Sequence, residues 1–327
     1  MAYSAQIMHL ARQELTRRKE DNQSQYNQRI QQAYAQVPRL RQIDLELRRT
    51  MTLAAQAVFI QGGDAAAAME QVKKENLALQ QERKELEKAY FEPGYLEEKP
   101  ICERCGGSGY LGSNMCRCLH SLCIAEQKRQ LQKLFLGQGS FDGFRLDVYT
   151  ANVDPELGVS PRAVMERTYQ RCQQYANDFQ PGAANLLFNG GTGLGKTYLS
   201  ACIAEDVTDK GFSVAYESAP QLFAKLEKNR FDPNDQSRAE VDAIMGCDLL
   251  IIDDLGTEMP GNFVTAALYA LLNDRLLENK SMLISTNLNA DELAQRYSGQ
   301  IASRLLGNFK TLTFVGKDIR VLKNRGY

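Results

Sequence analysis

The sequence predicts an α/β fold with a mostly parallel sheet, preceded by an all-α N-terminal domain and a small cysteine-rich element. From about residue 181 onward, short apolar stretches alternate with helical ones, which is typical of a parallel sheet covered on both faces. Long helical stretches with few Gly or Pro residues come before it, and two close pairs of cysteines lie between these parts. The expected divisions are a helical domain at 1–99, a cysteine element at 100–125, a connector that begins the C-terminal domain at 126–180, and its core at 181–327.

The helical part is rich in Gln, Arg, Glu, Leu and Ala, and Pro38, Gly62-Gly63 and Pro93-Gly94 interrupt it. Helices are therefore expected at about 3–36, 39–60 and 64–90. Two interpretations stay open for them: a solvated hairpin without a specific partner, or a module that docks on another protein. The strands expected in the C-terminal part are 185–188, 213–217, 249–252, 282–285 and 311–314.

The 327 residues carry a net charge of −1, so the overall charge does not point to nucleic acid, and any basic surface has to be local. No apolar run is long enough to cross a bilayer, and the first residues lack the pattern of a signal peptide. We therefore expect a cytoplasmic protein that makes no membrane contact.

Five of the eight cysteines fall between positions 102 and 123, and in a reducing compartment such a cluster favours metal over disulfides. The turns Cys102-Glu103-Arg104-Cys105 and Cys116-Arg117-Cys118 offer four thiolates that can enclose a structural, tetrahedral Zn²⁺. An iron–sulfur cluster uses the same ligand type, His120 and Cys123 are substitute ligands, and reduced thiols without metal are the alternative. The other cysteines, expected in or near the core, are Cys172, Cys202 and Cys247.

Residues 190–197 fit the phosphate-loop pattern G-x-x-x-x-G-K-[ST] at every fixed position, between an apolar stretch and a helical one. Backbone N–H groups of such a loop turn toward phosphate oxygens, and the following helix points its positive end at the same anion. Lys196 is expected to reach the β- and γ-phosphates, and Thr197 to bind Mg²⁺. The residues expected to bind the nucleotide are Gly190, Gly191, Thr192, Gly193, Leu194, Gly195, Lys196 and Thr197.

Two carboxylates follow the apolar run 249–252, and a buried parallel strand would deliver them to the sheet edge where the phosphate loop lies. Asp253 suits the Mg²⁺ shell, directly or through water, and Asp254 suits orientation or activation of the attacking water. The next strand ends in Ile284-Ser285-Thr286-Asn287, and Asn287 would lie between the two motifs and hydrogen-bond the water or the γ-phosphate. A turn or a helix cap is the alternative role of these polar residues.

The runs LLFNGGTGLGKTYLS, LLIIDDLGTE, STN and SGQIASRLLG together resemble the bacterial replicative-helicase loaders of the DnaC/DnaI type, which are AAA+ ATPases. The resemblance covers residues 140–327, and it extends more weakly to the cysteine element and helical region of the DnaI-like branch. It implies an AAA+ P-loop NTPase domain that hydrolyses ATP with Mg²⁺ and associates with copies of itself.

By position, the resemblance also implies an arginine finger, Arg304, which would reach the nucleotide of a neighbouring subunit. Arg320 resembles the late sensor arginine of the family; surface salt bridges are the alternative role of both arginines. The chain departs from the family at Gln300, where a second arginine often stands, so contact across the subunit boundary is expected to be weaker.

Loaders of this type hold a hexameric replicative DNA helicase of the DnaB type and single-stranded DNA. By alignment, Phe231 and Phe263 are the candidates for stacking on bases, with ordinary core packing as the alternative. The sequence thus predicts a helicase loader that acts in replication initiation or restart, with ATP hydrolysis driving release. Two alternatives are an IstB-type transposition ATPase that acts with a transposase on duplex DNA, and a nucleotide-dependent adaptor with negligible turnover.

Overall fold

The computed structural model describes residues 3–57, 64–135, 140–156, 158–319 and 321. The chain divides into two compact units, one of Met1–Gln13 with Arg117–Tyr327 and the other of Glu14–Cys116. The first unit contains a five-stranded parallel sheet with helices on both faces, and the second is mostly helical. The predicted fold class is confirmed.

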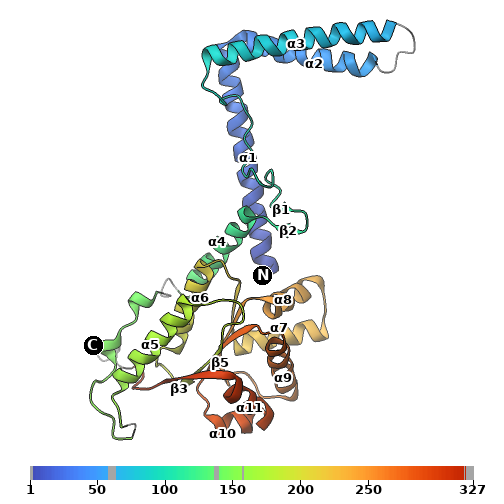
Figure 1. The fold of residues 1–327 in the computed structure, drawn as a ribbon. Helices are drawn as coiled ribbons and strands as arrows, with labels where there is room; N and C mark the ends of the chain where they lie inside the picture. Colours follow the sequence, from blue (N-terminus) through green and yellow to red (C-terminus); the bar gives the residue numbers. More distant parts are fainter. Residues whose placement is uncertain (1–2, 58–63, 136–139, 157, 320, 322–327) are drawn as a thin grey trace. The chain divides into compact units, whose positions relative to one another are not determined.

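The sheet has the strand order β4-β5-β6-β3-β7, and every neighbouring pair is parallel (Figure 1). Its central strands read as uninterrupted apolar runs because both faces are covered. In β3, for example, Leu186 and Phe188 belong to one core cluster and Leu187 to the other. The strands are β3 (Asn185–Gly190), β4 (Val214–Ser218), β5 (Leu249–Leu255), β6 (Ser281–Thr286) and β7 (Phe309–Phe314).

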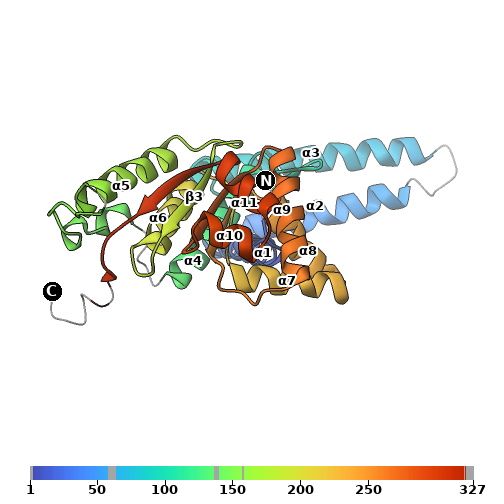
Figure 2. The ribbon, with the colours of Figure 1, turned by 90° about the horizontal axis from the view of Figure 1, so that it is seen from below.

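Two groups of helices cover the two faces of this sheet (Figures 1 and 2). The first group contributes residues to the core cluster that contains Phe188, and its members are α4 (Arg117–Leu134), α5 (Pro161–Asn177) and α6 (Lys196–Asp209). The second group packs on the cluster that contains Leu187, and its members are α7 (Ala219–Phe231), α8 (Asp235–Gly246), α9 (Asn262–Leu277), α10 (Ala290–Arg296) and α11 (Gly299–Asn308).

A buried amide of helix α4 adds to its apolar contacts with the first group. Gln127 donates to the Thr208 hydroxyl at 2.7 Å and accepts from the backbone N–H of Val214 at 3.1 Å, so it ties α4 to the start of β4. Two single-turn 3₁₀ helices, η1 (Phe141–Gly143) and η2 (Leu146–Val148), follow it along the chain.

The second unit contains most of α1 (Ala5–Gln36), all of α2 (Pro38–Ala57) and α3 (Asp64–Tyr90), and two short antiparallel strands, β1 (Tyr110–Leu111) and β2 (Asn114–Met115). Pro38 begins α2, where its fixed φ suits the first helical turn. A small apolar cluster holds the helices together, formed by Ala33, Val37, Leu40 and Leu96. Among the described residues, no helix has both the length and the apolar composition needed to cross a membrane.

Candidate functional site

The phosphate loop lies between the end of β3 and the start of α6, as the motif predicts. Gly190 has φ +152°, and a Cβ added there would be 2.2 Å from the carbonyl oxygen of Phe314 on the neighbouring strand β7. Only glycine fits so close to another backbone. The sheet therefore requires the first glycine of the motif.

The Lys196 ammonium points back into the loop. Its Nζ donates to the carbonyl oxygens of Gly190 and Gly191 at 2.7 Å each, and to Oδ1 of Asn287 at 2.5 Å. Lys196 is buried, with an exposed fraction of 5%. The structure thus brings together Lys196 from the loop and Asn287, which follows β6.

A cavity of about 460 Å³ opens beside this loop, and residues from three motifs line it. Thr192–Thr197, Asp254 and Asn287 form its polar part. Such a combination of backbone N–H groups, an ammonium, a carboxylate and an amide is what a magnesium–triphosphate group needs. The cavity is therefore the candidate nucleotide site.

The other wall of the cavity is aromatic and aliphatic, and reasoning from motifs missed it. Tyr149 donates its hydroxyl proton to the carbonyl oxygen of Leu194 at 2.9 Å, which attaches this wall to the phosphate loop. The run Phe141–Leu146 was the available signal, since two aromatic residues stand there next to a glycine. The apolar lining side chains are Phe135, Phe144, Val148, Tyr149, Tyr198 and Ile319.

Asp253 is buried at the end of β5 and held by the two neighbouring strands. Its Oδ1 accepts from the Ser285 hydroxyl at 2.5 Å, and its Oδ2 accepts from the Tyr216 hydroxyl at 2.9 Å. Burial, and then the Asp253 carboxylate, raise the pKa of Tyr216 well above its ordinary value, so this hydroxyl stays a donor. Asp253 and the Thr197 hydroxyl are oxygen ligands of the type Mg²⁺ prefers, so the residues fit the ion.

Asp254 lies one residue further along, where the pairing of β5 with β6 shifts register. It has φ +55°, a left-handed conformation that Asp tolerates better than most residues. Its N–H donates to the Ser285 hydroxyl at 2.8 Å, and its carbonyl oxygen accepts from the Thr257 hydroxyl at 2.8 Å. The bulge turns Asp254 into the cavity while Asp253 stays buried behind it. Ser285, Tyr216 and Thr257 are supporting residues that the sequence reasoning missed.

Arg304 lies on α11, held against α9, and does not line the cavity described above. Its guanidinium donates to the Tyr269 hydroxyl at 3.0 Å and to Oδ1 of Asn273 at 3.1 Å, and it lies 4.5 Å above the Tyr269 ring centroid. Gln300 is exposed in the first turn of the same helix. Arg320, the other arginine predicted at the site, lies outside the described residues.

Phe231 and Phe263, predicted from separate parts of the sequence, lie next to each other with ring centroids 6.2 Å apart. The guanidinium of Arg230 lies 5.7 Å from one centroid and 5.6 Å from the other. Phe231 is 71% exposed at the end of α7, so ordinary core packing does not account for it. The three side chains form an exposed aromatic and cationic cluster, the chemistry that unpaired bases stack on.

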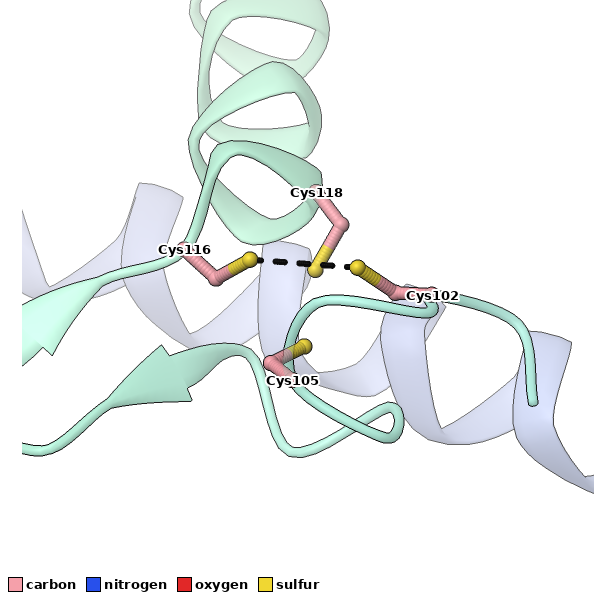
Figure 3. A group of neighbouring side chains, drawn as sticks. All are labelled: Cys102, Cys105, Cys116 and Cys118. Carbon is pink, nitrogen blue, oxygen red and sulfur yellow. Dashed lines mark hydrogen bonds between the residues drawn. The ribbon is translucent and has the colours of Figure 1, made fainter.

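The four cysteines of the predicted metal element lie together, in the segment that runs from the loop before β1 to the first turn of α4 (Figure 3). Their sulfur atoms are all within 4.8 Å of one another, and the Sγ atoms of Cys102 and Cys116 are 3.8 Å apart. Tetrahedral zinc with bonds of about 2.3 Å sets its sulfur ligands about 3.8 Å apart, so the donor set fits zinc.

The two substitute ligands lie elsewhere. His120 contacts the Gly211 carbonyl oxygen at 3.1 Å, and the buried Cys123 thiol contacts the Met8 sulfur at 3.6 Å. Burial raises the pKa of Cys123 to about 11, which disfavours the thiolate that a metal needs. Cys172, Cys202 and Cys247 are buried, as predicted.

Residues 167–310 match the family model of the IstB-like ATP binding proteins. The replicative helicase loader DnaC of Escherichia coli (strain K12) is 22% identical over 139 residues, which cover 42% of this chain and 57% of the loader. An ATP-binding protein of insertion sequence IS232 from Bacillus thuringiensis subsp. berliner is 28% identical over 142 residues, which cover 42% of this chain and 56% of that protein. The crystal structure of the DnaC helicase loader aligns with a TM-score of 0.44 at 20% identity, over 54% of this chain and 98% of that one.

These matches span little more than half the length of the two curated relatives. The family model includes the phosphate loop, the acidic pair and Arg304. The resemblance to the loaders and the ATPase class predicted from the sequence are confirmed, and the insertion-sequence proteins match this part of the chain as well.

Proposed function

We propose that this chain is an ATP-dependent loader that places a replicative helicase of the hexameric DnaB type on single-stranded DNA. The observation that carries the ATP-dependent part of the proposal is the cavity at the carboxyl edge of the sheet, where Lys196, Asp254 and Asn287 meet. Asp254 orients the attacking water, and Asp253 and Thr197 bind Mg²⁺. Lys196 and Asn287 contact the γ-phosphate, so both exchange their present contact for a new one when ATP binds.

In this proposal Arg304 completes the site of a neighbouring copy. An arginine that is half-buried and held by Tyr269 and Asn273 is positioned by its own chain, yet does not line its own cavity. This combination suits a finger that acts in trans, because the guanidinium is ordered before the subunits meet. Arg320 would sense the same phosphate within the chain, by resemblance only.

The cluster of Arg230, Phe231 and Phe263 is the proposed contact with single-stranded DNA. Its aromatic faces are sequence-tolerant, and the guanidinium adds attraction to phosphate and to the bases. The helical domain is proposed to bind the helicase, and the four cysteines to hold a structural zinc. In this role the protein works in the cytoplasm.

A transposition ATPase of the IstB type is the second candidate, and the family-model match favours it. It would use the same ATP site with a transposase as partner and duplex DNA as ligand. The exposed aromatic cluster favours the loader, since duplex bases are already stacked on one another.

The deciding experiment measures phosphate release with single-stranded and with duplex DNA of the same length, together with capture of a hexameric helicase. The loader proposal expects stimulation by single strands and a stable complex with the helicase. Arg304→Ala is expected to keep ATP binding by the monomer and to lose the stimulation by DNA. Stimulation by duplex alone, without helicase capture, would favour the transposition role, and no turnover under any condition would favour an adaptor.

A further inference from the structure

Glu258 is a buried carboxylate that the ATP site as described does not use. It is 5% exposed, in the loop between β5 and α9. Its Oε2 accepts from the backbone N–H of Gly256 at 3.0 Å, and its Oε1 accepts from the Tyr297 hydroxyl at 2.5 Å. The Arg296 guanidinium donates to the backbone carbonyl oxygen of Glu258 and lies 3.4 Å from Glu258 Oε1. Burying a carboxylate is costly unless it is paired in this way, so these contacts define where the loop lies.

One side of this network supports Asp254. The loop turns sharply after that residue, through Gly256 at φ +109°, where a Cβ would be 2.7 Å from Leu288. Thr257 closes the turn, since its N–H and its hydroxyl both donate to the Asp254 carbonyl oxygen. The Glu258 carboxylate holds the same turn by accepting from the Gly256 N–H. The left-handed conformation that aims Asp254 into the cavity therefore depends on a turn that the Glu258 carboxylate closes.

The other side of the network supports α11. Arg296 ends α10 and Tyr297 follows it, with Ser298 capping α11 by accepting from the Ile301 N–H at 3.2 Å. Tyr297 is 6% exposed and belongs to the same core cluster as Ile301. Burial, and then the contact with Glu258, raise the pKa of Tyr297 far above its ordinary value, so it remains a donor near neutral pH.

We propose that Glu258 is a positioning residue that ties the loop bearing Asp254 to the start of the helix bearing Arg304. Asp254, which orients water in the subunit's own nucleotide site, and Arg304, which reaches the site of the next subunit, are then linked through the contacts of Glu258. This inference rests on the proposed function, because it takes Asp254 to act on the attacking water. It deepens that function by naming the contact through which the two ends of a subunit communicate.

The test compares Glu258→Gln and Tyr297→Phe with Glu278→Gln, a control in which the same substitution is made at an exposed ion pair with Lys280. Steady-state turnover and the affinity for a non-hydrolysable ATP analogue are measured separately, with single-stranded DNA present. Glu258→Gln is expected to lower kcat at least about tenfold, because small misplacements of a catalytic group are costly, while the analogue affinity changes less than about twofold. Tyr297→Phe keeps the ring and loses one donor, so its expected fall in kcat is smaller. Glu278→Gln is expected to match the parent.

The same measurements on Glu258→Gln combined with Arg304→Ala test the connection. If Glu258 and Arg304 act through the same connection, the fold-decrease in kcat of the double variant is smaller than the product of the two single fold-decreases. Unchanged kcat in Glu258→Gln and Tyr297→Phe, a parallel loss of analogue affinity and thermal stability, or fully multiplicative losses would overturn the proposal. Asp254→Asn distinguishes a failure of the proposed function from a failure of this inference. If Asp254→Asn hydrolyses ATP at the parent rate, the proposed ATP site is wrong. If Asp254→Asn is inactive and Glu258→Gln has the parent kcat, only the positioning role of Glu258 is wrong.

Discussion

The sheet that carries the candidate ATP site and the hairpin of α2 and α3 bury their side chains to very different extents. In β5, Leu249, Leu250, Ile251 and Ile252 are all 0% exposed. In α3, none of the residues whose side chains are described, 70–90, is buried. Two ion pairs between α2 and α3 take part of the role that apolar packing has in the sheet: Arg39 with Glu82, and Arg83 with Asp44.

This difference suits two different tasks. A phosphate site has to hold donors and carboxylates in place before the reaction, and a close-packed sheet does that. Both ion pairs are partly exposed, with side chains between 21% and 41% exposed. Pairs that water still reaches contribute on the order of 1 kcal/mol each, so we expect the hairpin to be held more weakly than the sheet. It also leaves Leu45 and Leu77 exposed, by 54% and 56%. A helix pair with unused apolar side chains has more to gain from a partner than a completed core does.

The largest effect is expected on ATP binding at the edge of the sheet where the phosphate loop lies. Lys196→Ala removes the only ammonium among the residues described as lining the cavity. Because hydrogen bonds to charged groups are strong, the affinity for ATP is expected to fall at least about a hundredfold. Isothermal titration with ATP and Mg²⁺ measures the loss. Lys210→Ala, at the far end of α6, is the control, and equal affinity in the two variants would contradict the assignment.

The cysteine element gives the next largest effect, because a short segment without a core depends on its metal. The purified protein is expected to hold about one zinc per chain, and Cys116→Ala to hold much less. Cys172 is also a buried cysteine, so Cys172→Ala is the control, and that variant should hold as much zinc as the parent. Metal analysis after purification under reducing conditions checks both. Equal zinc content in the parent and in Cys116→Ala would contradict the four-cysteine zinc site.

Much of the rigid region was readable from local sequence. The strands and the phosphate loop were predicted because a buried parallel strand is an apolar run and a phosphate loop is a contiguous motif. Asn287 was placed beside the loop because parallel strands end at one edge. Tyr216, Ser285 and Glu258 were missed as supporting residues. Ser285 and Glu258 stand in the STN and LLIIDDLGTE runs, but a run does not reveal a contact with a distant part of the chain, and Tyr216 belongs to no such run.

In the helical region the ranges of the helices were predictable from the sequence, but the division into compact units was not. The helices α1, α2 and α3 lie close to their predicted ranges, since helix interruption by Pro and Gly is local. The compact units, however, divide the chain inside α1, between Gln13 and Glu14. The chain up to Gln13 belongs to the unit with the candidate nucleotide site, where Tyr3 packs on His120 of α4 and Met8 contacts Cys123. The helical pattern alone does not reveal that packing.

A third prediction concerns the small core of the helical unit. Leu40 is 1% exposed in the cluster with Ala33 and Val37, so Leu40→Ala should cost about 2–4 kcal/mol of the free energy of unfolding. Urea unfolding followed by helical circular dichroism measures the loss. The affinity for ATP should not change, since no residue of that cluster lines the cavity. A loss of less than about 0.5 kcal/mol would mean that this cluster does not hold the unit together.

The smallest effect on stability is expected on the exposed side of the same hairpin, and it sharpens the contrast most. Leu77→Ala is the same substitution as Leu40→Ala, but the side chain is 56% exposed, so stability should change by less than about 0.5 kcal/mol. If the hairpin is the surface that binds a helicase, helicase capture should nevertheless weaken several-fold, because a partner would bury that side chain. Leu277→Ala, 78% exposed on α9, is the control for a general loss of surface apolarity. Capture unchanged in Leu77→Ala and in Leu45→Ala would place the partner on another surface and leave the hairpin as a solvated spacer.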